Sequence, residues 1–322
     1  MSRRLRLLRT GIEPHHEILE IGPYHKPIAP KALGYRTTSL DILDAASLRR
    51  LAVDDPHIAS HEVAGIEEVD VVGSACDLAD HVRGALGPEA RFDWVLSSHN
   101  IEHMPNPIRF LRQAADVLRD GGVLRLAVPD KRACFDHFRP LTDVSEWLQA
   151  HDENRMQPTV YQLFREDCLR SVLEMGGRQL QSWQLGDMEG GRLRPAGNSL
   201  DLYRRWFGGE RPGHYVDTHC WAFTPESFEL LVRDVIAFGL VPLRVARVSA
   251  TRGHEFFADL VRPAAGAGAG AADEADYLEN RTRLLRQSVR DDDSALAGRV
   301  PLPLRMARRA KRFLRSLARR AA

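Results

Sequence analysis

The sequence has no long run of apolar residues and no recognisable secretion signal. No stretch approaches the roughly 18 consecutive apolar residues that a membrane-spanning helix needs. The basic N-terminus, MSRRLRLLRT, is not followed by an apolar segment of signal-peptide length. These absences predict a cytoplasmic protein that stays on the side of the membrane where it is made.

The chain also has few cysteines and a small net charge. The chain has four cysteines and no C-x-x-C pair, which is typical of reduced thiols rather than of a disulfide framework or a zinc knuckle. The formal net charge of the 322 residues is only +1, so a basic surface that wraps nucleic acid is not expected. With 43% hydrophobic and 28% charged residues, the composition is that of an ordinary enzyme, built as one large domain with an insertion or as two modest domains.

Short apolar segments alternate with helical ones over the first 130 residues. A helix is expected where Asn106 is a good N-cap, Pro107 suits the first helical position and Gly121 follows as a terminator. Strands that alternate with helices predict an α/β fold with a doubly wound, mostly parallel sheet. The strands are expected at 17–21, 35–42, 69–78, 92–98 and 123–129.

Two further segments complete the first domain, which we expect to span residues 1–263. Residues 131–220 are rich in aromatic side chains and interrupt the alternation of strands and helices. They predict a helical insertion over the carboxyl ends of the strands, where it would serve as a substrate lid. A helix that begins at Thr224 and Pro225 is followed by two strands within 240–263, which close the sheet as a hairpin.

The end of the chain changes in composition twice. Residues 264–298 are first low in complexity and predict a flexible linker with a short helix. Residues 299–322 are a basic amphipathic tail, with apolar side chains at helical spacing among arginines. The tail has three interpretations: a frayed, solvated terminus, a peripheral helix at the inner face of an anionic membrane, or an RNA contact.

The first expected strand runs into a turn with little glycine. The segment HEILEIGPYHKP, residues 16–27, contains Gly22 but lacks the G-x-G-x-x-G pattern of dinucleotide sites. A pyrophosphate would meet side chains there instead of bare backbone, which disfavours NAD. Asp41 follows Glu20 by about 20 residues, at the tip of the second expected strand, where an acidic side chain can bind ribose hydroxyls. A cofactor with a ribose and no phosphate fits these features.

Four segments, in this order, resemble the motifs of class I S-adenosylmethionine-dependent methyltransferases. LEIGPYHKP resembles motif I, Asp41 matches the acidic residue that ends the second strand, and ACDL, with Asp77, matches the position that contacts adenine. FDWVLSSHNIEHMPNPIRFLRQAADVLRDGGVLRLAVPD is similar to the block from the fourth strand to the fifth. The resemblance covers residues 15–131 and 222–262. It implies a Rossmann-like, seven-stranded sheet and S-adenosyl-L-methionine as cofactor.

The resemblance also implies roles for individual residues. Glu20 and Gly22 would line the methionine portion of the cofactor. Asp41 would bind the ribose hydroxyls, and Asp77 the adenine amino group. Three consecutive residues would lie where the cofactor meets the substrate: Ser98, His99 and Asn100.

The turn after Gly22 departs from the family pattern, because it lacks the second and third glycines. Its bulk would either lower the affinity for the cofactor or allow Tyr24 and His25 to contact the substrate. It also favours an alternative function, that of a non-catalytic protein that uses the methyltransferase fold to bind a glycan or a protein partner.

Methyl transfer from a sulfonium needs an in-line nucleophile and, when the acceptor is a hydroxyl, a base that removes its proton. Three histidines are candidate bases: His99, His103 and His219. Asp217 lies close to the last of them in the sequence. The expected reaction is O-methylation of a small molecule or of a cell-envelope glycan, since the aromatic insertion and the basic tail suit a glycan acceptor.

Two segments have metal-like spacing, but no metal site is expected in either. HNIEH, residues 99–103, fits the H-x-x-E-H motif of inverted zinc proteases. That motif needs a continuous helix, whereas this segment directly follows a strand and precedes Pro105. Glu102 and His103 are therefore expected to brace a loop. In HYVDTHCW, residues 214–221, ordinary hydrogen bonding at the border of the insertion explains the polar residues.

Overall fold

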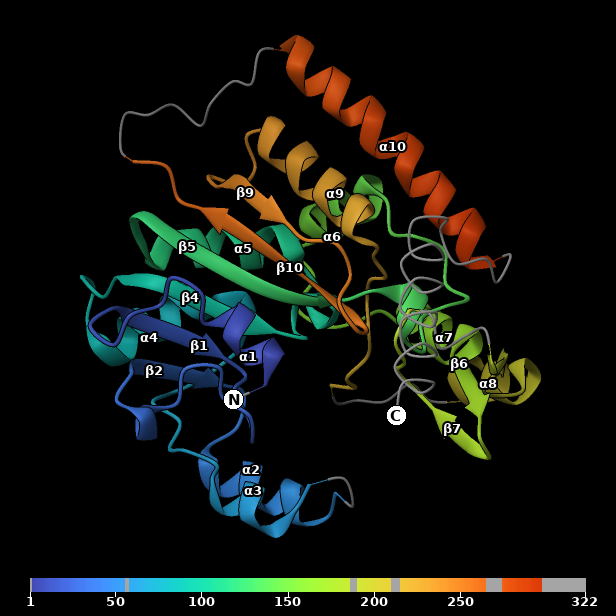
Figure 1. Cartoon of the computed structure of the whole chain (residues 1–322), viewed down its shortest axis with the longest axis horizontal. Helices are drawn as coiled ribbons and strands as arrows, with labels where there is room; N and C mark the ends of the chain where they lie inside the picture. The colour runs from blue at the N-terminus through green and yellow to red at the C-terminus, as the bar shows by residue number, and fades with distance from the viewer. Residues whose placement is uncertain (1, 56–57, 186–189, 210–214, 265–273, 297–322) are drawn as a thin grey trace, which may run out of the picture.

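A seven-stranded sheet forms the centre of the computed structural model, which describes residues 2–55, 58–185, 190–209, 215–264 and 274–296. Its strands are β1 (Glu17–Ile21), β2 (Arg36–Asp41), β3 (Val71–Val72), β4 (Phe92–Ser98), β5 (Leu118–Pro129), β9 (Arg244–Val248) and β10 (Glu255–Val261). They lie in the order β3-β2-β1-β4-β5-β10-β9 (Figure 1). β1 to β5 pair in parallel, whereas β10 runs antiparallel to β5 and to β9. The α/β class and the mostly parallel, seven-stranded sheet are confirmed.

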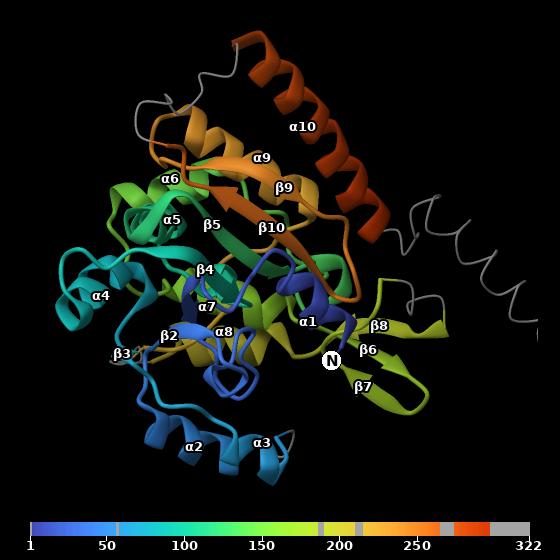
Figure 2. The same cartoon turned by 60° about the vertical axis from the view of Figure 1, so that its left-hand side comes forward.

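Each face of the sheet has its own apolar core. One face packs against α4 (Leu78–Leu86), α5 (Pro107–Val117), α6 (Val144–Asp152) and α9 (Pro225–Ala237). The other face is covered by α1 (Arg3–Leu8) and by the loop after β1, where Leu8 and Ile28 pack against Ile18 and Phe257. Figure 2 shows α1 and α9 on opposite sides of the sheet. β1 is buried at four of its five positions, as central strands of parallel sheets are, although Glu17 and Glu20 interrupt its apolar residues.

The helix α5 begins where its sequence predicts and ends earlier. The Asn106 side chain accepts a hydrogen bond from the Arg109 amide (3.0 Å), and Pro107 occupies the first turn. The predicted end at Gly121 is wrong, because α5 stops at Val117. The Gly121 amide instead donates to the Arg262 carbonyl (2.9 Å), so this glycine belongs to the end of the β5–β10 pairing.

The third expected strand is also shorter than predicted. Only Val71–Val72 pair with β2 as β3. The Ser74 side chain accepts a hydrogen bond from the Cys76 amide and begins the short 3-10 helix η2 (Ala75–Asp77), which leads directly into α4. This local capping competes with strand extension, because the serine hydroxyl offers the backbone a partner outside the sheet.

The insertion combines helices with a small sheet that was not predicted. Its helices are α6, α7 (Val160–Leu169) and α8 (Ser199–Phe207), and its strands are β6 (Ser171–Met175), β7 (Arg178–Leu180) and β8 (Arg192–Pro195), in the order β7-β6-β8. The glycines between β6 and β7, Gly176 and Gly177, have φ angles of 57° and 74°. Two consecutive positive φ angles are typical of the tightest hairpin turns, so this Gly-Gly pair is the sequence signal for the hairpin.

Three further helices lie outside the helices that cover the sheet. α2 (Ala45–Val53) and α3 (Ser60–Ala64) form a small core of their own, against which Tyr24 packs. α10 (Glu274–Leu296) lies along α9, as Figure 1 shows, and is much longer than the short helix expected between 264 and 298. The short 3-10 helices that complete the fold are η1 (Lys31–Leu33), η3 (Ile101–His103) and η4 (Lys131–Ala133).

Some of the sequence-based expectations concern residues that the structure does not describe. The basic tail, 299–322, and His214 lie outside the described residues. Within the described residues, no helix has both the length and the apolar character needed to cross a membrane. The domain boundaries at 263 and 298 remain predictions.

Candidate active site

The turn after β1 is compact because two of its residues adopt left-handed backbone conformations. Gly22 has a φ of 62° and Tyr24 a φ of 44°. The Gly22 amide donates to the Leu40 carbonyl (2.8 Å), which holds the turn against the end of β2. A Cβ built on Gly22 would meet no atom within 4 Å, so the space beside this backbone is open. Tyr24 thus replaces one of the missing glycines, at a cost of about 1–2 kcal/mol for a non-glycine residue in this conformation.

Glu20 fixes the loop that follows this turn. Its carboxyl group is buried and accepts hydrogen bonds from the amides of Ile28 (2.5 Å) and Ala29 (2.9 Å). Burial raises the pKa of Glu20 to about 7, although the two backbone hydrogen bonds oppose this rise. The structure therefore places Glu20 inside the loop, with both carboxyl oxygens already bonded to the backbone.

Asp41 ends β2 beside the same turn. It is 9% exposed, and its Oδ1 accepts from the Leu43 amide at the long distance of 3.4 Å. Burial raises the pKa of Asp41, in spite of the backbone hydrogen bonds that oppose it. The Asp41 carbonyl accepts from the Gly73 amide (2.8 Å), so the ends of β2 and β3 meet here. The structure thus brings Gly22 and Asp41 to one edge of the sheet, as predicted from the parallel strand order.

Asp77 lies where η2 meets α4, and Arg109 of α5 holds it. The Arg109 guanidinium donates to Asp77 Oδ1 from Nε (2.9 Å) and from Nη2. Both side chains are partly exposed, so the pair lies at the surface of the same sheet edge. The sequence did not indicate this partner, because Arg109 follows Asp77 by 32 residues, which include α4 and β4.

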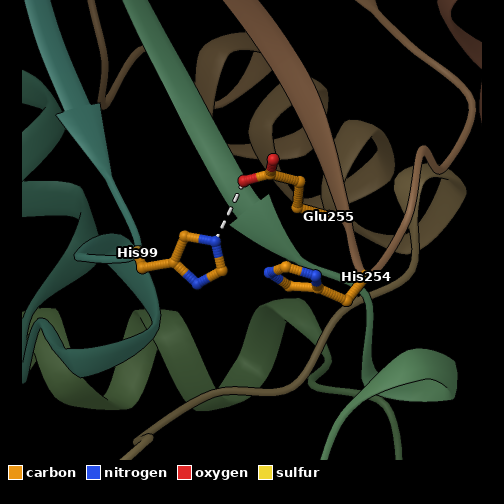
Figure 3. A group of neighbouring side chains, drawn as sticks. All are labelled: His99, His254 and Glu255. Carbon is orange, nitrogen blue, oxygen red and sulfur yellow. Dashed lines mark hydrogen bonds and ion pairs between the residues drawn. The ribbon is translucent and has the colours of Figure 1, made fainter. Parts of the chain in front are cut away.

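The residues after β4 form the next part of this edge. His99 has a φ of 51°, and its amide donates to the Ala127 carbonyl of β5 (2.9 Å). Its Nε2 atom lies 3.0 Å from Oε2 of Glu255, the first residue of β10 (Figure 3). The Asn100 side chain donates to Ser97 Oγ (3.0 Å). A left-handed residue at the end of a buried strand is a costly conformation for histidine, which marks this position as one held by its surroundings.

Glu255 is the centre of a charged group that sequence reasoning missed. Its carboxylate accepts from Nε (2.6 Å) and Nη2 (3.0 Å) of Arg4 in α1. The same guanidinium donates to Ser98 Oγ (2.6 Å). Burial would raise the pKa of Glu255, but His99 and Arg4 outweigh it and lower the pKa to about 2. His254 packs against His99 with ring centroids 5.5 Å apart, as Figure 3 shows.

A second cluster lies directly beyond His99, around Glu102. HNIEH folds as the two residues that follow β4 and the single turn η3, so the continuous helix of the inverted zinc-protease motif is not formed. Glu102 is fully buried, and its Oε1 atom lies 3.7 Å from His99 Nδ1, 3.9 Å from His103 Nε2 and 4.0 Å from His219 Nε2. The fold therefore gathers all three candidate bases around one carboxyl group.

The outer nitrogens of two of these histidines are bonded to carboxylates. His103 Nδ1 lies 2.9 Å from Asp217 Oδ1, and His219 Nδ1 lies 2.5 Å from Asp136 Oδ2. Burial lowers the pKa of His103, but Asp217 and Glu102 outweigh it and raise the pKa to about 9. The pKa of Asp136 falls well below its usual range, because His219 and Arg139 together outweigh the cost of burial.

Comparison with known proteins addresses the family of this chain. Residues 1–235 match a family model described as a methyltransferase domain. The chain is also similar to a solved glycopeptide N-methyltransferase, MtfA, in complex with sinefungin, with 14% identity, a TM-score of 0.38, and coverage of 81% of this chain and 93% of that one. A second similar structure is the CcbJ methyltransferase from Streptomyces caelestis, with 14% identity, a TM-score of 0.40, and coverage of 80% of this chain and 93% of that one. A third is an S-adenosylmethionine-dependent methyltransferase from Mesorhizobium loti, with 13% identity, a TM-score of 0.39, and coverage of 80% of this chain and 96% of that one.

A search among curated proteins found no significant match. The family model nevertheless covers well over half of the chain, and it includes every cofactor-binding position predicted from the sequence. The protein is therefore a member of the methyltransferase-domain family.

Proposed function

We propose that the protein transfers a methyl group from S-adenosylmethionine to a hydroxyl group of a small molecule or a glycan. The observation that carries this proposal is the placement of His99. This histidine lies at the carboxyl edge of the sheet, next to the proposed cofactor positions, and is hydrogen-bonded to the charged carboxylate of Glu255. A carboxylate that orients an imidazole is a common arrangement for a general base.

The residues present fit a nucleoside cofactor without phosphates. The open space beside Gly22 lets a ligand approach the backbone closely. The Asp41 carboxylate has acceptor capacity beyond its long bond to the Leu43 amide, which suits two ribose hydroxyls. Asp77, oriented by Arg109, is proposed to accept from the adenine amino group. Ser98 and Asn100 flank His99 where the cofactor is proposed to meet the acceptor.

Glu20 has a different place in this proposal from the one implied by the resemblance. Its two oxygens bind the Ile28 and Ala29 amides, so it acts through the loop rather than by direct contact. The loop includes the crowded turn, and Tyr24 in that turn packs against the α2–α3 core. We therefore propose that Glu20 positions the Gly22 backbone for the methionine portion of the cofactor.

In the proposed reaction, the cofactor supplies the methyl group and the side chains of the protein move the proton. S-adenosylmethionine supplies an electrophilic methyl group on a positively charged sulfur. Glu255 holds a proton on His99 Nε2, which leaves the Nδ1 lone pair free to accept the proton of an acceptor hydroxyl. The imidazolium formed in this way is paired with the Glu255 carboxylate, which stabilises its charge. The acceptor oxygen, with its proton passing to His99, would form a bond to the methyl carbon while the carbon–sulfur bond breaks and S-adenosylhomocysteine leaves.

The insertion, residues 131–220, is proposed as the acceptor platform. It contributes Asp136, Asp217 and His219 to the cluster around Glu102, so an acceptor bound near His99 would also meet the insertion. The insertion carries polar and acidic side chains as well as aromatic ones, and these polar groups can form hydrogen bonds with a hydroxylated ligand. A glycan of the cell envelope and a small hydroxylated metabolite are both consistent with this surface.

Calorimetry with S-adenosylhomocysteine tests the cofactor site. The full chain is expected to bind one molecule, and Asp41→Ala is expected to weaken binding about tenfold or more, since it removes a hydrogen-bonded charged acceptor. Asp54→Ala, which removes an exposed carboxylate of the same region, is the matched control and is expected to bind like the wild type. A well-folded wild-type protein that binds neither S-adenosylhomocysteine nor S-adenosylmethionine would overturn the proposal.

Turnover separates catalysis from the alternative, a methyltransferase-fold protein that only binds a glycan or a protein. Incubation with labelled S-adenosylmethionine and fractionated cell extract is expected to label one hydroxyl-bearing product. Binding of the cofactor without any labelled product from envelope or metabolite fractions would favour the non-catalytic alternative.

A further inference from the structure

We infer that Glu102, His103 and His219 bind one divalent transition-metal ion. The three ligand atoms would be a carboxyl oxygen of Glu102 and the two Nε2 atoms, and they lie within 4.8 Å of one another. This inference departs from the sequence-based expectation, which considered metals only within HNIEH and within HYVDTHCW. The fold instead joins one half of each segment, because η3 lies against the end of the insertion.

Glu102 has no hydrogen-bond partner among the described residues that would offset the cost of its burial. It is 0% exposed, and neither of its carboxyl oxygens has a hydrogen-bond partner within the described residues. The surrounding imidazole nitrogens, at 3.7–4.0 Å, are beyond hydrogen-bonding distance. An unsatisfied carboxyl group is costly inside a protein, and a cation at the centre of these groups would satisfy it.

The two histidines are oriented as metal ligands are. Asp217 holds Nδ1 of His103 and Asp136 holds Nδ1 of His219, so both Nε2 atoms face Glu102. A carboxylate on the outer nitrogen fixes the ring and the tautomer and raises the basicity of the ligating nitrogen. Asp136 is itself anchored by the buried Arg139, which also donates to the His219 and Cys220 carbonyls. This support resembles a built site rather than a chance approach of polar residues.

The spacing requires little movement. A tetrahedral site with bonds of about 2.0–2.2 Å places its ligand atoms about 3.3–3.6 Å apart. The Glu102 oxygen lies 3.9 Å and 4.0 Å from the two Nε2 atoms, so these two separations need to shorten by only a few tenths of an ångström. The two Nε2 atoms lie within 4.8 Å of each other. Binding would displace any proton from His103, because imidazole ligates in its neutral form.

The donor set indicates the class of metal. Two imidazoles and one carboxylate suit Zn²⁺ and its first-row neighbours, such as Fe²⁺, Mn²⁺ and Co²⁺, rather than Mg²⁺ or Ca²⁺, which prefer oxygen ligands. Three protein ligands leave a position for an exogenous ligand. His99 Nδ1 lies 3.7 Å from the Glu102 oxygen, so the proposed base lies beside the proposed metal site. If the proposed function holds, the exogenous ligand is an oxygen of the acceptor.

A second cluster of histidine and carboxyl side chains at this edge of the sheet is less suited to bind a metal ion than the cluster around Glu102. His99, His254 and Glu255 also bring three ligand atoms together, as Figure 3 shows. Glu255, however, is already paired with the Arg4 guanidinium through two hydrogen bonds. A cation there would compete with a bound positive charge, whereas the described surroundings of Glu102 contain no arginine or lysine hydrogen bond to it.

Metal analysis of the full chain tests the site without any assay of methyl transfer. The chelator-treated protein is expected to bind one Zn²⁺ ion per chain by calorimetry, and one Co²⁺ ion with the visible absorption of a nitrogen- and oxygen-ligated centre. Glu102→Gln keeps the shape of the side chain and is expected to weaken Zn²⁺ binding at least 100-fold. Asp217→Asn, which removes the support of His103, is expected to weaken it about 10- to 100-fold. His254→Gln is the matched control and is expected to bind Zn²⁺ as the wild type does.

Thermal unfolding gives a second readout. Zn²⁺ is expected to raise the unfolding temperature of the wild type and of His254→Gln, and to leave that of Glu102→Gln unchanged. The inference is overturned if the folded wild type binds neither Zn²⁺, Mn²⁺ nor Co²⁺, or if Glu102→Gln binds them with wild-type affinity. Either result would leave S-adenosylhomocysteine binding unaffected, so the test fails independently of the proposed function.

Discussion

At the scale of single residues, Glu20 is a buried carboxyl group that holds the loop after Gly22. The amides of Ile28 and Ala29 form one wall of the loop after Gly22, and both depend on Glu20 for a hydrogen bond. The carboxyl group lies at the end of a central strand, where its burial favours the neutral form. Its protonation therefore couples the stability of the fold to pH.

Glu20→Gln is expected to change how stability depends on pH. Because the folded-state pKa of Glu20 is raised from 4.5 to about 7, its stabilisation is complete below pH 4.5 and is lost as the pH rises through 7. The glutamine variant does not titrate, so its free energy of unfolding should gain up to about 3 kcal/mol relative to the wild type between pH 4.5 and 8. Urea unfolding of both proteins at several pH values measures this gain. A difference that stays constant with pH would contradict the expected burial of a titrating group.

His99 and Glu255 are expected to affect turnover more than cofactor binding. His99→Ala removes the proposed proton acceptor and should lower the rate of product formation about 100-fold or more. Glu255→Gln keeps the hydrogen bond but removes the negative charge, and should lower the rate by a smaller factor, about tenfold. Rates are measured with the acceptor fraction found by labelling, and S-adenosylhomocysteine affinity by calorimetry. His254→Gln is the control for the same surface, and a His99→Ala rate equal to that of this control would exclude His99 as the base.

At the scale of secondary-structure elements, local sequence signals predicted the beginnings of elements better than their ends. α5 begins at its predicted cap because Asn106 and Pro107 act within a single turn. Its end depends on Arg262, which pairs with Gly121 and Gly122 from the far end of β10. No local pattern contains that information. The small sheet β7-β6-β8 was missed for another reason, since its signal was present in the Gly176–Gly177 turn but the aromatic composition was given more weight.

α10 gives a prediction about stability at this scale. Arg281 and Tyr277 of α10 both bond to Asp234 of α9, which is 1% exposed. Arg281→Met removes the charged partner of a buried carboxylate and is expected to lower the free energy of unfolding by about 1–3 kcal/mol. Arg283→Met, on the same helix with an exposed hydrogen bond to Gln287, should change the free energy of unfolding by no more than about 0.5 kcal/mol. Urea unfolding followed by circular dichroism compares them. Equal effects of the two variants would mean that α10 is not held by this contact.

At the scale of the whole molecule, the candidate site joins parts of the chain that are remote in sequence. The residue types were predicted from the sequence, because His99, His103 and His219 were each candidate bases. Their convergence was not predicted, since it requires the insertion to return to the end of β4 and place His219 beside Glu102. Arg4 of α1 is the clearest omission, because a basic N-terminal helix carries no motif, yet it reaches Ser98 and Glu255.

The distribution of charge over the whole chain leads to a prediction about membranes. The tail, 299–322, contains nine basic and no acidic residues. Since the whole chain has a net charge of +1, the chain without this tail carries −8. An anionic surface should therefore attract the tail and repel the rest of the chain. Each basic residue close to such a surface can contribute about 1 kcal/mol to the free energy of binding.

Sedimentation with lipid vesicles measures this response. The full chain is expected to sediment with vesicles rich in phosphatidylserine at low salt, and to be released at about 0.5 M salt, where charges are screened within a few ångströms. A chain that ends at residue 298 should stay in the supernatant with the same vesicles, because its net negative charge is repelled. Vesicles of phosphatidylcholine alone are the control and should retain neither protein. If the full and shortened chains sediment equally, the tail does not bind membranes. Sedimentation that persists at high salt would instead mean that burial of the apolar side chains at helical spacing, rather than the arginines, provides the attachment.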